Sequence, residues 1–357
     1  MDQRASSTVA ATVAVERVLT TRELNRALLA RQLLLERSPA SLPRALERLA
    51  GIQAQYAPSM YIGLWSRLEG LEREQLTRAL ERRTVVEATL MRVTIHLVSR
   101  RDYWPFALAT REARRALWLR GERRAPGARE MAAAAERLRE HLAEGPLRRA
   151  RVEELLGKPI AAGVGLWIDL VRAPPSGTWE RRRADLYAAA DVWLGPPAMT
   201  VPESVDLLVR RYLGAFGPAS RGDIASWSGL ALGALAPALE RLRLRRFRAE
   251  SGDELLDLPR GPLPDPQTPA PVRFLPTWDA TLLVHARRTG LLPEQYRARI
   301  FNPRNPHSLP TFLVDGAVAG IWRHRGGRIE LEPFARLDGA TRRELAEEAE
   351  RLAAFHA

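Results

Sequence analysis

Two glutamines stand two positions apart in the segment Gln53-Ala54-Gln55, between Gly51 and Pro58. Each amide offers two donors and an acceptor oxygen, so two convergent amides can hold a water molecule or a sugar-phosphate oxygen in a fixed orientation. They do not readily take up a proton. Side chains two residues apart share one face of an extended segment, whereas they diverge in a helix. The alternative role is structural, because such amides also bridge backbone groups between two helices.

The amino-acid composition excludes several kinds of catalytic and metal-binding site. It has no cysteine, which excludes disulfides, thiolate metal sites, iron–sulfur clusters and a cysteine nucleophile. The histidines show no paired spacing of the kind that zinc sites use, so we expect no metal and no cofactor. These histidines are His96, His141, His285, His307, His324 and His356.

The composition is that of a globular protein with a strong positive charge. Hydrophobic residues make up 46%, charged residues 27%, and the formal net charge is +13. This charge favours a polyanion such as nucleic acid, although nearly all of it is arginine, a bias that a GC-rich coding sequence would also give. No run approaches the roughly 18 apolar residues of a membrane helix, and residues 1–17 have the composition of a disordered tail. We expect a cytoplasmic, nucleoid-associated protein without membrane contact.

The elements around the glutamines predict a winged helix-turn-helix. Thr20 and Glu23 have the spacing of a capping box, and Gly51 stands where a second helix would end in a left-handed cap. Helices followed by a β-hairpin are the order of a winged helix, with the hairpin as the wing. The expected elements are helices that begin near Thr21, Ser41, Pro58 and Glu72, followed by strands at 84–90 and 94–98.

The same order returns twice at low similarity, so we predict three tandem winged helices. Gly-Pro precedes a short polar helix start at both Gly145 and Gly217, which supports a repeat. In the second unit we expect an apolar helix at 161–171 and a wing formed by 176–183 and 185–188. The predicted units are winged helices at 18–104, 105–200 and 201–260.

A proline-rich linker at 259–271 leads into a region of different character, which we place at 261–357. Short β-rich runs dominate it, among them 281–285, and Asp315-Gly316 between two apolar runs is a strong hairpin signal. A last helix at 341–355 carries opposite charges at i,i+4 and is expected to pack on the sheet. The predicted fold class is α+β: three winged helices followed by a small β-barrel with a terminal helix.

Seven short segments carry a family resemblance. They are Leu24–Arg26, Leu49–Pro58, Leu64–Leu68, Thr89–Arg92, Thr94–Ser99, Phe274–Asp279 and Pro310–Gly316. In this order they resemble the AlkZ/YcaQ-like winged-helix DNA glycosylases of bacteria. The resemblance covers nearly the whole chain after residue 18, and the ordered set is more specific than any one motif.

The resemblance implies a fold of three tandem winged helices and a β-barrel around a concavity of DNA size. It also implies that Gln53 and Gln55 are the catalytic pair that positions the hydrolytic water against C1′ of the damaged nucleotide. The family signature is Gln, an apolar residue, then Gln or Asp. This sequence departs from the family in the small Ala54 between the glutamines and in Val93, where a glycine is expected in the wing turn.

The chemistry is coherent for a purine alkylated at N7 or N3. Such a base is positively charged and leaves as a neutral group without a general acid, so the enzyme needs an oriented water and stabilisation of the developing oxocarbenium. We expect a monofunctional DNA glycosylase that acts on double-stranded DNA carrying alkylated purines, with bulky adducts and interstrand crosslinks as further candidate lesions. Housekeeping repair of alkylation damage and self-resistance to a genotoxic natural product both fit these motifs.

Other residues have candidate roles beside the glutamines. His96 alternates with Thr94 on one strand face, where a structural histidine is the alternative. Asp279 is a candidate to orient a DNA backbone or a glutamine amide, or to cap a turn, and Tyr56 to stack near a lesion or join the core. Candidate phosphate contacts, each also compatible with a solvated face, are Arg92, Arg181, Arg182, Arg183, Arg243 and Arg245.

The main alternative is a non-catalytic winged-helix DNA-binding protein such as a transcription regulator, because a fold does not by itself set a function. A regulator would normally dimerise to read two half-sites. Three winged helices in one chain instead suit a monomer that surrounds one duplex, and we expect a monomer.

Overall fold

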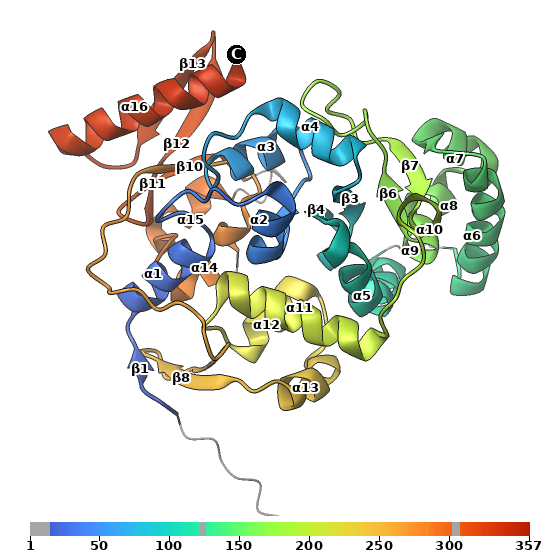
Figure 1. The fold of residues 1–357 in the computed structure, drawn as a ribbon, viewed down its shortest axis with the longest axis horizontal. Coiled ribbons are helices and arrows are strands. Elements are labelled where there is room, and N and C mark those ends of the chain that lie inside the picture. Colours follow the sequence, from blue (N-terminus) through green and yellow to red (C-terminus); the bar gives the residue numbers. More distant parts are fainter. Residues whose placement is uncertain (1–14, 122–125, 284, 302–307) are drawn as a thin grey trace, which may run out of the picture.

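The computed structural model describes residues 15–121, 126–283, 285–301 and 308–357. Within these ranges the protein is an α+β structure, with helices packed around β-sheets of three, four and six strands (Figure 1). The α+β class is as predicted.

The first region folds as helices followed by a hairpin, as predicted. Thr20 accepts a hydrogen bond from the backbone of Glu23, whose side chain bonds back, so the capping box is confirmed. The elements are β1 (Val18–Leu19), α1 (Thr21–Arg31), α2 (Leu42–Leu49), β2 (Ile52–Gln53), α3 (Ala57–Trp65), α4 (Arg73–Glu81), β3 (Val85–Thr89), the 3-10 turn η1 (Met91–Val93) and β4 (Ile95–Ser99).

The second region differs from the prediction in its strands. Residues 161–171 were expected to form one helix, but Asp169 takes a left-handed backbone (φ 54°) that ends the helical stretch and starts a strand. The wing expected at 176–183 is a loop, in which the Ser176 hydroxyl accepts from the backbone of Asp185. The elements are α5 (Arg100–Gly121), α6 (Ala128–Ala143), β5 (Leu147–Arg148), α7 (Arg149–Leu156), α8 (Lys158–Gly163), α9 (Gly165–Ile168), β6 (Leu170–Arg172), β7 (Leu186–Ala189) and α10 (Ala190–Leu194).

One six-stranded sheet joins the hairpins of these two regions, in the order β2-β4-β3-β6-β7-β5. Strands β3 and β6 pair antiparallel, with Glu87 opposite Arg172. The glutamine segment supplies the edge strand β2, which pairs antiparallel with β4. The two expected wings therefore form a continuous sheet, and the count of three winged helices stays a prediction.

The third region packs against the start of the described chain. Strand β1 runs parallel to β8, and the backbone N–H of Glu16 donates to the carbonyl of Arg246 at 2.9 Å. Residues 15–17 of the expected tail thus lie along a strand, while residues 1–14 fall outside the described ranges. The elements are α11 (Val201–Phe216), α12 (Arg221–Ser228), α13 (Leu232–Arg241), β8 (Arg245–Ala249) and β9 (Glu254–Asp257).

The C-terminal sheet is open, so the predicted barrel is not confirmed. Its order is β10-β11-β12-β13, and the two outer strands do not pair with each other. Asp315 and Gly316 both take a left-handed backbone (φ 46° and 79°) in the predicted hairpin. The prediction of a strand at 281–285 is wrong, because a 3-10 turn ends at Leu282 and a helix begins at His285. Residue 284 between them lies outside the described ranges. The elements are β10 (Arg273–Leu275), η2 (Ala280–Leu282), α14 (His285–Arg288), α15 (Glu294–Ile300), β11 (Thr311–Val314), β12 (Ala317–Arg325), β13 (Arg328–Pro333) and α16 (Gly339–His356).

Two large hydrophobic cores hold the regions together. One includes Phe106, Tyr212 and Trp227 and joins the six-stranded sheet to α5, α11 and α12. The other joins α3 to the C-terminal sheet and α16, through residues such as Tyr61 and Phe312. The C-terminal sheet therefore packs directly on the helix that follows the glutamines. Among the described helices, none is long and apolar enough to cross a membrane.

Gly51 offers a direct test of how the glutamine segment is held. Its φ is +75°, and a Cβ atom there would lie 2.7 Å from Cγ1 of Val98 and 3.0 Å from the carbonyl oxygen of Leu97. Gly51→Ala adds a left-handed backbone cost of about 1 kcal/mol and a clash with β4, so we expect the free energy of unfolding to fall by more than about 2 kcal/mol.

Gly70→Ala separates these two effects in the same unfolding experiment. Gly70 also has a positive φ, +56°, but nothing lies within 4 Å of the added methyl group. This variant should therefore lose only the backbone contribution. Equal losses of stability in the two variants would contradict the close approach to β4.

Candidate functional site

The first glutamine lies on the edge strand of the six-stranded sheet. Ala50 and Gly51, both left-handed (φ 58° and 75°), end α2 and turn the chain into β2. Gln53 then stands opposite His96 in the antiparallel ladder, so their side chains lie on the same face of the sheet. Gln53 is 8% exposed. Within the described ranges its amide makes no hydrogen bond, which leaves its donors and its acceptor available.

His96 is buried and neutral. Its Nδ1 lies 3.0 Å from the carbonyl oxygen of Thr94, which can only accept, so Nδ1 carries the hydrogen and Nε2 is an acceptor. Burial, and then the positive charge of Arg92, lowers the pKa of His96 to about 3. The imidazole therefore cannot serve as a charged acid at neutral pH, but Nε2 can accept a hydrogen bond beside Gln53.

The second glutamine lies beyond the strand and is exposed. The backbone N–H of Ala54 donates to the carbonyl of Ile95 at 2.8 Å, and the N–H of Ile95 donates to Oε1 of Gln55 at 3.1 Å. The side-chain oxygen of Gln55 thus takes the place of a backbone carbonyl at the end of the β2–β4 ladder, and this hydrogen bond fixes the orientation of the amide. Its NH2 group has no hydrogen-bond partner among the described residues, so both of its hydrogens are available to a ligand.

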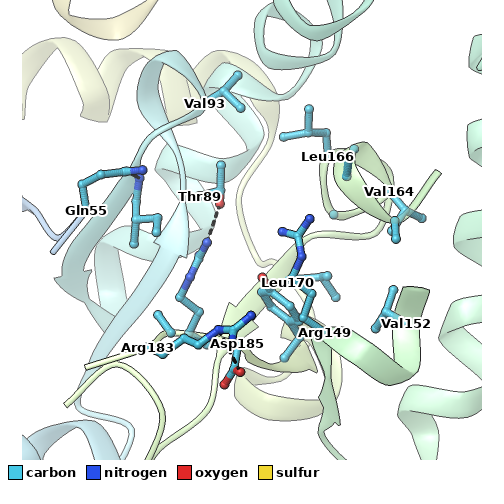
Figure 2. A pocket seen from close by; sticks show the side chains of 18 residues that line it. Gln55, Thr89, Val93, Arg149, Val152, Val164, Leu166, Leu170, Arg183 and Asp185 are labelled. Carbon is cyan, nitrogen blue, oxygen red and sulfur yellow. Dashed lines mark hydrogen bonds and ion pairs between the residues drawn. The ribbon is translucent and has the colours of Figure 1, made fainter. Parts of the chain in front are cut away.

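Gln55 lies in the wall of a cavity of about 510 Å³ between the first two regions (Figure 2). The other walls come from β3, β6, β7, α7 and the turn between α8 and α9. Gln53 is not among the lining residues, so this cavity receives only one of the two amides. The lining residues are Gln55, Thr89, Val93, Ile95, Arg149, Val152, 161–166, Leu170, Arg172, Arg183, Ala184, Asp185 and Tyr187.

Arg172 supplies a buried positive charge to this cavity. Its Nη2 donates to the hydroxyl of Thr89 at 3.1 Å, and its guanidinium lies 5.6 Å from the ring centroid of Tyr187. The side chain is only 9% exposed, and the Nε atom lies 3.8 Å from Oε1 of Glu87. A guanidinium held by a hydroxyl and an aromatic ring is well placed for a phosphate.

Glu87 is a buried carboxylic acid next to Arg172. Its side chain is 1% exposed, and neither oxygen has a hydrogen-bond partner in the part of the chain that the structure describes. Burial raises the pKa of Glu87 to about 8, against the opposing effect of Arg172. Glu87 is therefore mostly protonated at pH 7 and does not neutralise Arg172.

Two further arginines at the cavity have acidic partners. Arg149 pairs with Glu153 at 2.7 Å and Arg183 pairs with Asp185 at 3.3 Å. Exposed pairs of this kind are weak, so a phosphate can displace the carboxylate. Among the described residues, no group of three histidine or acidic side chains is arranged to hold a metal ion.

Of the other residues predicted beside the glutamines, Thr94 lies next to His96, whose Nδ1 donates to its carbonyl, whereas Asp279 and Tyr56 have surroundings of their own. Thr94 donates its hydroxyl to the backbone within the β3–β4 turn at 3.0 Å. Asp279 accepts from the backbone of Thr281 at 3.0 Å and pairs with buried Arg67 at 2.9 Å, so it caps η2, one of the two roles considered. Among the described residues it has no hydrogen bond with either glutamine. Tyr56 is 42% exposed and lies at the surface rather than in the core.

The predicted arginine contacts fall in separate places. Arg181–Arg183 are exposed on the loop between β6 and β7. Arg92 has a left-handed backbone (φ 53°), and its Nη1 donates to the carbonyl of Trp227. Arg243 is exposed, whereas Arg245 forms an ion pair with a glutamate before β1. In Figure 1, β8 lies far from β6 and β7, so these six side chains do not form one surface.

Sequence reasoning missed Arg172, Glu87 and Arg149. A charged residue inside each of two apolar runs, Glu87 within 85–90 and Arg172 after Leu170, was the available signal. These charged residues point to a site only when β3 and β6 are known to pair. The helix predicted at 161–171 overlaps β6, so the sequence analysis did not predict that pairing.

Comparisons with known proteins agree with this fold. A family model described as DNA glycosylase AlkZ-like matches residues 46–355. The solved structure of Streptomyces sahachiroi DNA glycosylase AlkZ is similar with a TM-score of 0.77 and 18% sequence identity, over 95% of this chain and 97% of that one. At this identity the structural likeness shows the fold alone. A search of curated proteins finds no match.

The buried carboxyl of Glu87 predicts a pH dependence of stability. Its pKa rises from 4.5, the ordinary value, to about 8 in the folded protein. The folded state then binds more protons between these values, so this residue lowers stability as the pH rises from about 5 to about 8. We expect Glu87→Gln to melt near the wild-type temperature at pH 5 and at least about 2 °C above it at pH 8.

The control for this melting experiment is Glu112→Gln, because the side chain of Glu112 is 82% exposed. It should shift the melting temperature little and by the same amount at both pH values. A pH-independent shift in Glu87→Gln as well would contradict a protonated acid at position 87.

Proposed function

The chain belongs to the AlkZ-like DNA glycosylase family, and from this premise we propose that it hydrolyses the N-glycosidic bond of N7- or N3-alkylated purines in double-stranded DNA. Gln53 and Gln55 are the proposed catalytic pair. Bulky adducts and interstrand crosslinks are candidate lesions, in repair of alkylation damage or in self-resistance. The protein is proposed to act as a monomer.

The observation that carries this proposal is the pairing of Gln53 with a buried, neutral histidine. Gln53 lies beside the neutral His96, and both have an acceptor atom without a partner among the described residues. Two neutral acceptors can orient the hydrogens of one water molecule without repelling a cationic base. A substrate whose base already carries the positive charge needs no proton from the enzyme.

In the proposed reaction the bond between C1′ and N9 of the purine breaks, and its electrons leave with the base. The positive charge of the alkylated ring is thereby neutralised. The oriented water forms the new bond to C1′ of the oxocarbenium-like sugar and releases a proton to solvent. Gln53 and His96 position the water, and the free NH2 group of Gln55 donates to a sugar or phosphate oxygen nearby.

The cavity beside Gln55 is the proposed contact with the DNA backbone. The protonated Glu87 does not neutralise the charge of Arg172. Arg149 and Arg183 have weak acidic partners that a phosphate can replace. Arginine forms paired hydrogen bonds with phosphate oxygens, which would fix the register of the damaged strand.

Strand cleavage by a Schiff base is not part of the proposal. Such chemistry needs an amine nucleophile, and Lys158 is the only lysine of the chain. Lys158 opens α8 but is not among the residues that line the cavity with Gln55. We therefore propose a monofunctional glycosylase that leaves an abasic site.

The test is base release from a duplex that carries a single 7-methylguanine, under single-turnover conditions. We expect Gln53→Ala and Gln55→Ala each to lower the rate by about 10² or more, because Gln53 is proposed to position the water and Gln55 a sugar or phosphate oxygen of the damaged nucleotide. Gln267→Ala, at an exposed glutamine elsewhere, should leave the rate unchanged.

Two outcomes would change the assignment. Loss of activity in Asp185→Asn with full activity in both glutamine variants would move the water-activating role to that carboxylate, which lines the same cavity. Tight binding of undamaged duplex without release of any base would instead favour the non-catalytic DNA-binding protein.

A further inference from the structure

The turn that joins β3 to β4 has a strained backbone. Its two central residues, Arg92 and Val93, have φ angles of 53° and 59°. The backbone N–H of Thr94 donates to the carbonyl of Met91 at 3.1 Å across them. Tight turns with a positive φ at both central positions normally contain glycine, asparagine or aspartate, because a Cβ atom there crowds the following carbonyl oxygen. A β-branched residue such as Val93 is rare in this conformation, so the surrounding structure must hold the turn.

Arg92 connects the turn to the C-terminal end of α12. Its Nη1 donates to the carbonyl oxygen of Trp227, in the last turn of that helix. Carbonyl oxygens at a helix C-terminus lack partners within the helix and carry a partial negative charge, so a guanidinium stabilises them. The chain after α12 also lies against the turn, since a Cβ atom at Gly229 would be 3.6 Å from the backbone nitrogen of Arg92. Through Arg92, the third region thus supports a turn of the first region.

The peptide unit that follows the turn contacts the surroundings of both glutamines. Its carbonyl oxygen, from Thr94, accepts from Nδ1 of His96 at 3.0 Å and so fixes the tautomer of the ring beside Gln53. Its N–H, from Ile95, donates to Oε1 of Gln55 at 3.1 Å. The two groups belong to one planar unit, so a rotation of that plane would move both hydrogen bonds. The conformation of the turn therefore acts on both parts of the candidate site.

Arg92 itself lies outside the cavity that contains Gln55. It is half-buried and is not among the lining residues, whereas Val93 is. In Figure 2 the side chain of Val93 lies at the end of the cavity away from Arg183. The positive charge of Arg92 nevertheless acts at the site, because it is the second cause, after burial, of the low pKa of His96. Arg92 is thus close to the reaction centre without a position from which to touch a substrate in the cavity.

We infer that Arg92 is a positioning residue for the proposed hydrolysis rather than a contact with a DNA phosphate. Its hydrogen bond to the end of α12 holds the strained turn and, through the turn, the peptide unit between Thr94 and Ile95. This unit orients the amide of Gln55 and the ring of His96. The inference rests on the proposed function for its effect on base release. The tautomer of His96, however, is measurable without catalysis.

The first experiment compares the full-length wild type with Arg92→Met, which keeps a long apolar side chain but has no donor. Base release from the duplex with a single 7-methylguanine is measured in single turnover at saturating enzyme. We expect the rate to fall by at least about tenfold, because small displacements at a reaction centre cost large factors. The dissociation constant of the duplex should change by less than about threefold, because no phosphate contact is lost.

A phosphate contact at Arg92 predicts a different result. Its loss would weaken duplex binding and lower the dependence of binding on salt by about one ion. The rate at saturating enzyme would stay unchanged. That combination would overturn the inference.

The matched control is Arg83→Met. Arg83 is also half-buried, has a φ of 58° and donates Nη1 to the backbone carbonyl of Trp193 at 3.2 Å. It precedes β3, whereas the turn follows that strand, and it does not line the cavity with Gln55. We expect the rate and the duplex affinity of this variant to stay within about twofold of the wild type. An equal loss of rate in Arg83→Met and Arg92→Met would show only a general effect of losing such an arginine, and would overturn the inference.

A double-mutant cycle with Val93→Gly tests whether Arg92 acts through the turn. Glycine adopts a positive φ without a steric cost, so a glycine at this position needs less support. We expect the factor by which Arg92→Met lowers the rate to be at least about threefold smaller in the Val93→Gly background than in the wild type. A phosphate contact would lose the same factor in both backgrounds, so equal factors would contradict the inference.

NMR of the imidazole of His96 gives a readout that needs no catalysis. We expect the hydrogen on Nδ1 in the wild type and a mixture of tautomers in Arg92→Met, because the carbonyl of Thr94 is no longer held in place. An unchanged tautomer together with an unchanged rate of base release would overturn this inference alone. A change of tautomer in a protein that releases no base from the lesion-containing duplex would overturn only the proposed function.

Discussion

The position of the glutamine segment depends on the close approach of its backbone to strand β4. Ala50 and Gly51 are both left-handed, and at Gly51 a side chain would collide with Val98 and with the carbonyl of Leu97. This turn lets β2 form the edge of the six-stranded sheet, where the ladder places Gln53 beside His96. The last hydrogen bond of this ladder joins the backbone N–H of Ile95 to the side-chain oxygen of Gln55. The turn at Gly51 therefore positions both glutamines, Gln53 beside His96 and Gln55 at the cavity.

Electrostatics divide the site into a neutral part and a positive part. Burial keeps His96 neutral next to Gln53, whereas the protonated Glu87 leaves the charge of Arg172 uncompensated in the adjoining cavity. A positive reaction centre would repel an alkylated, cationic base, and a neutral backbone cavity would not attract phosphate. The arrangement therefore suits a substrate with a cationic base on an anionic strand.

Local signals predicted much of the fold, and pairing between distant segments accounts for most of the errors. The capping box at Thr20 and the hairpin at Asp315-Gly316 are confirmed because short-range geometry determines them. Val93, which stands where glycine was expected, does take a left-handed backbone (φ 59°). The contact of Glu87 with Arg172 depends on β3 pairing with β6, 80 or more residues apart in numbering, which no local pattern encodes. For the same reason the sequence predicts one site for both glutamines, whereas the structure gives them different surroundings.

The most direct test of this account compares two lesions in otherwise identical duplexes. Single-turnover rates of base release would be measured for 7-methylguanine, which is cationic, and for hypoxanthine, which is uncharged. A site that orients water but supplies no proton should release 7-methylguanine at least about 10² times faster, the smallest contribution that a general acid usually makes. Comparable rates for the two bases would show that the enzyme protonates its leaving group, and would contradict a neutral reaction centre at Gln53 and His96.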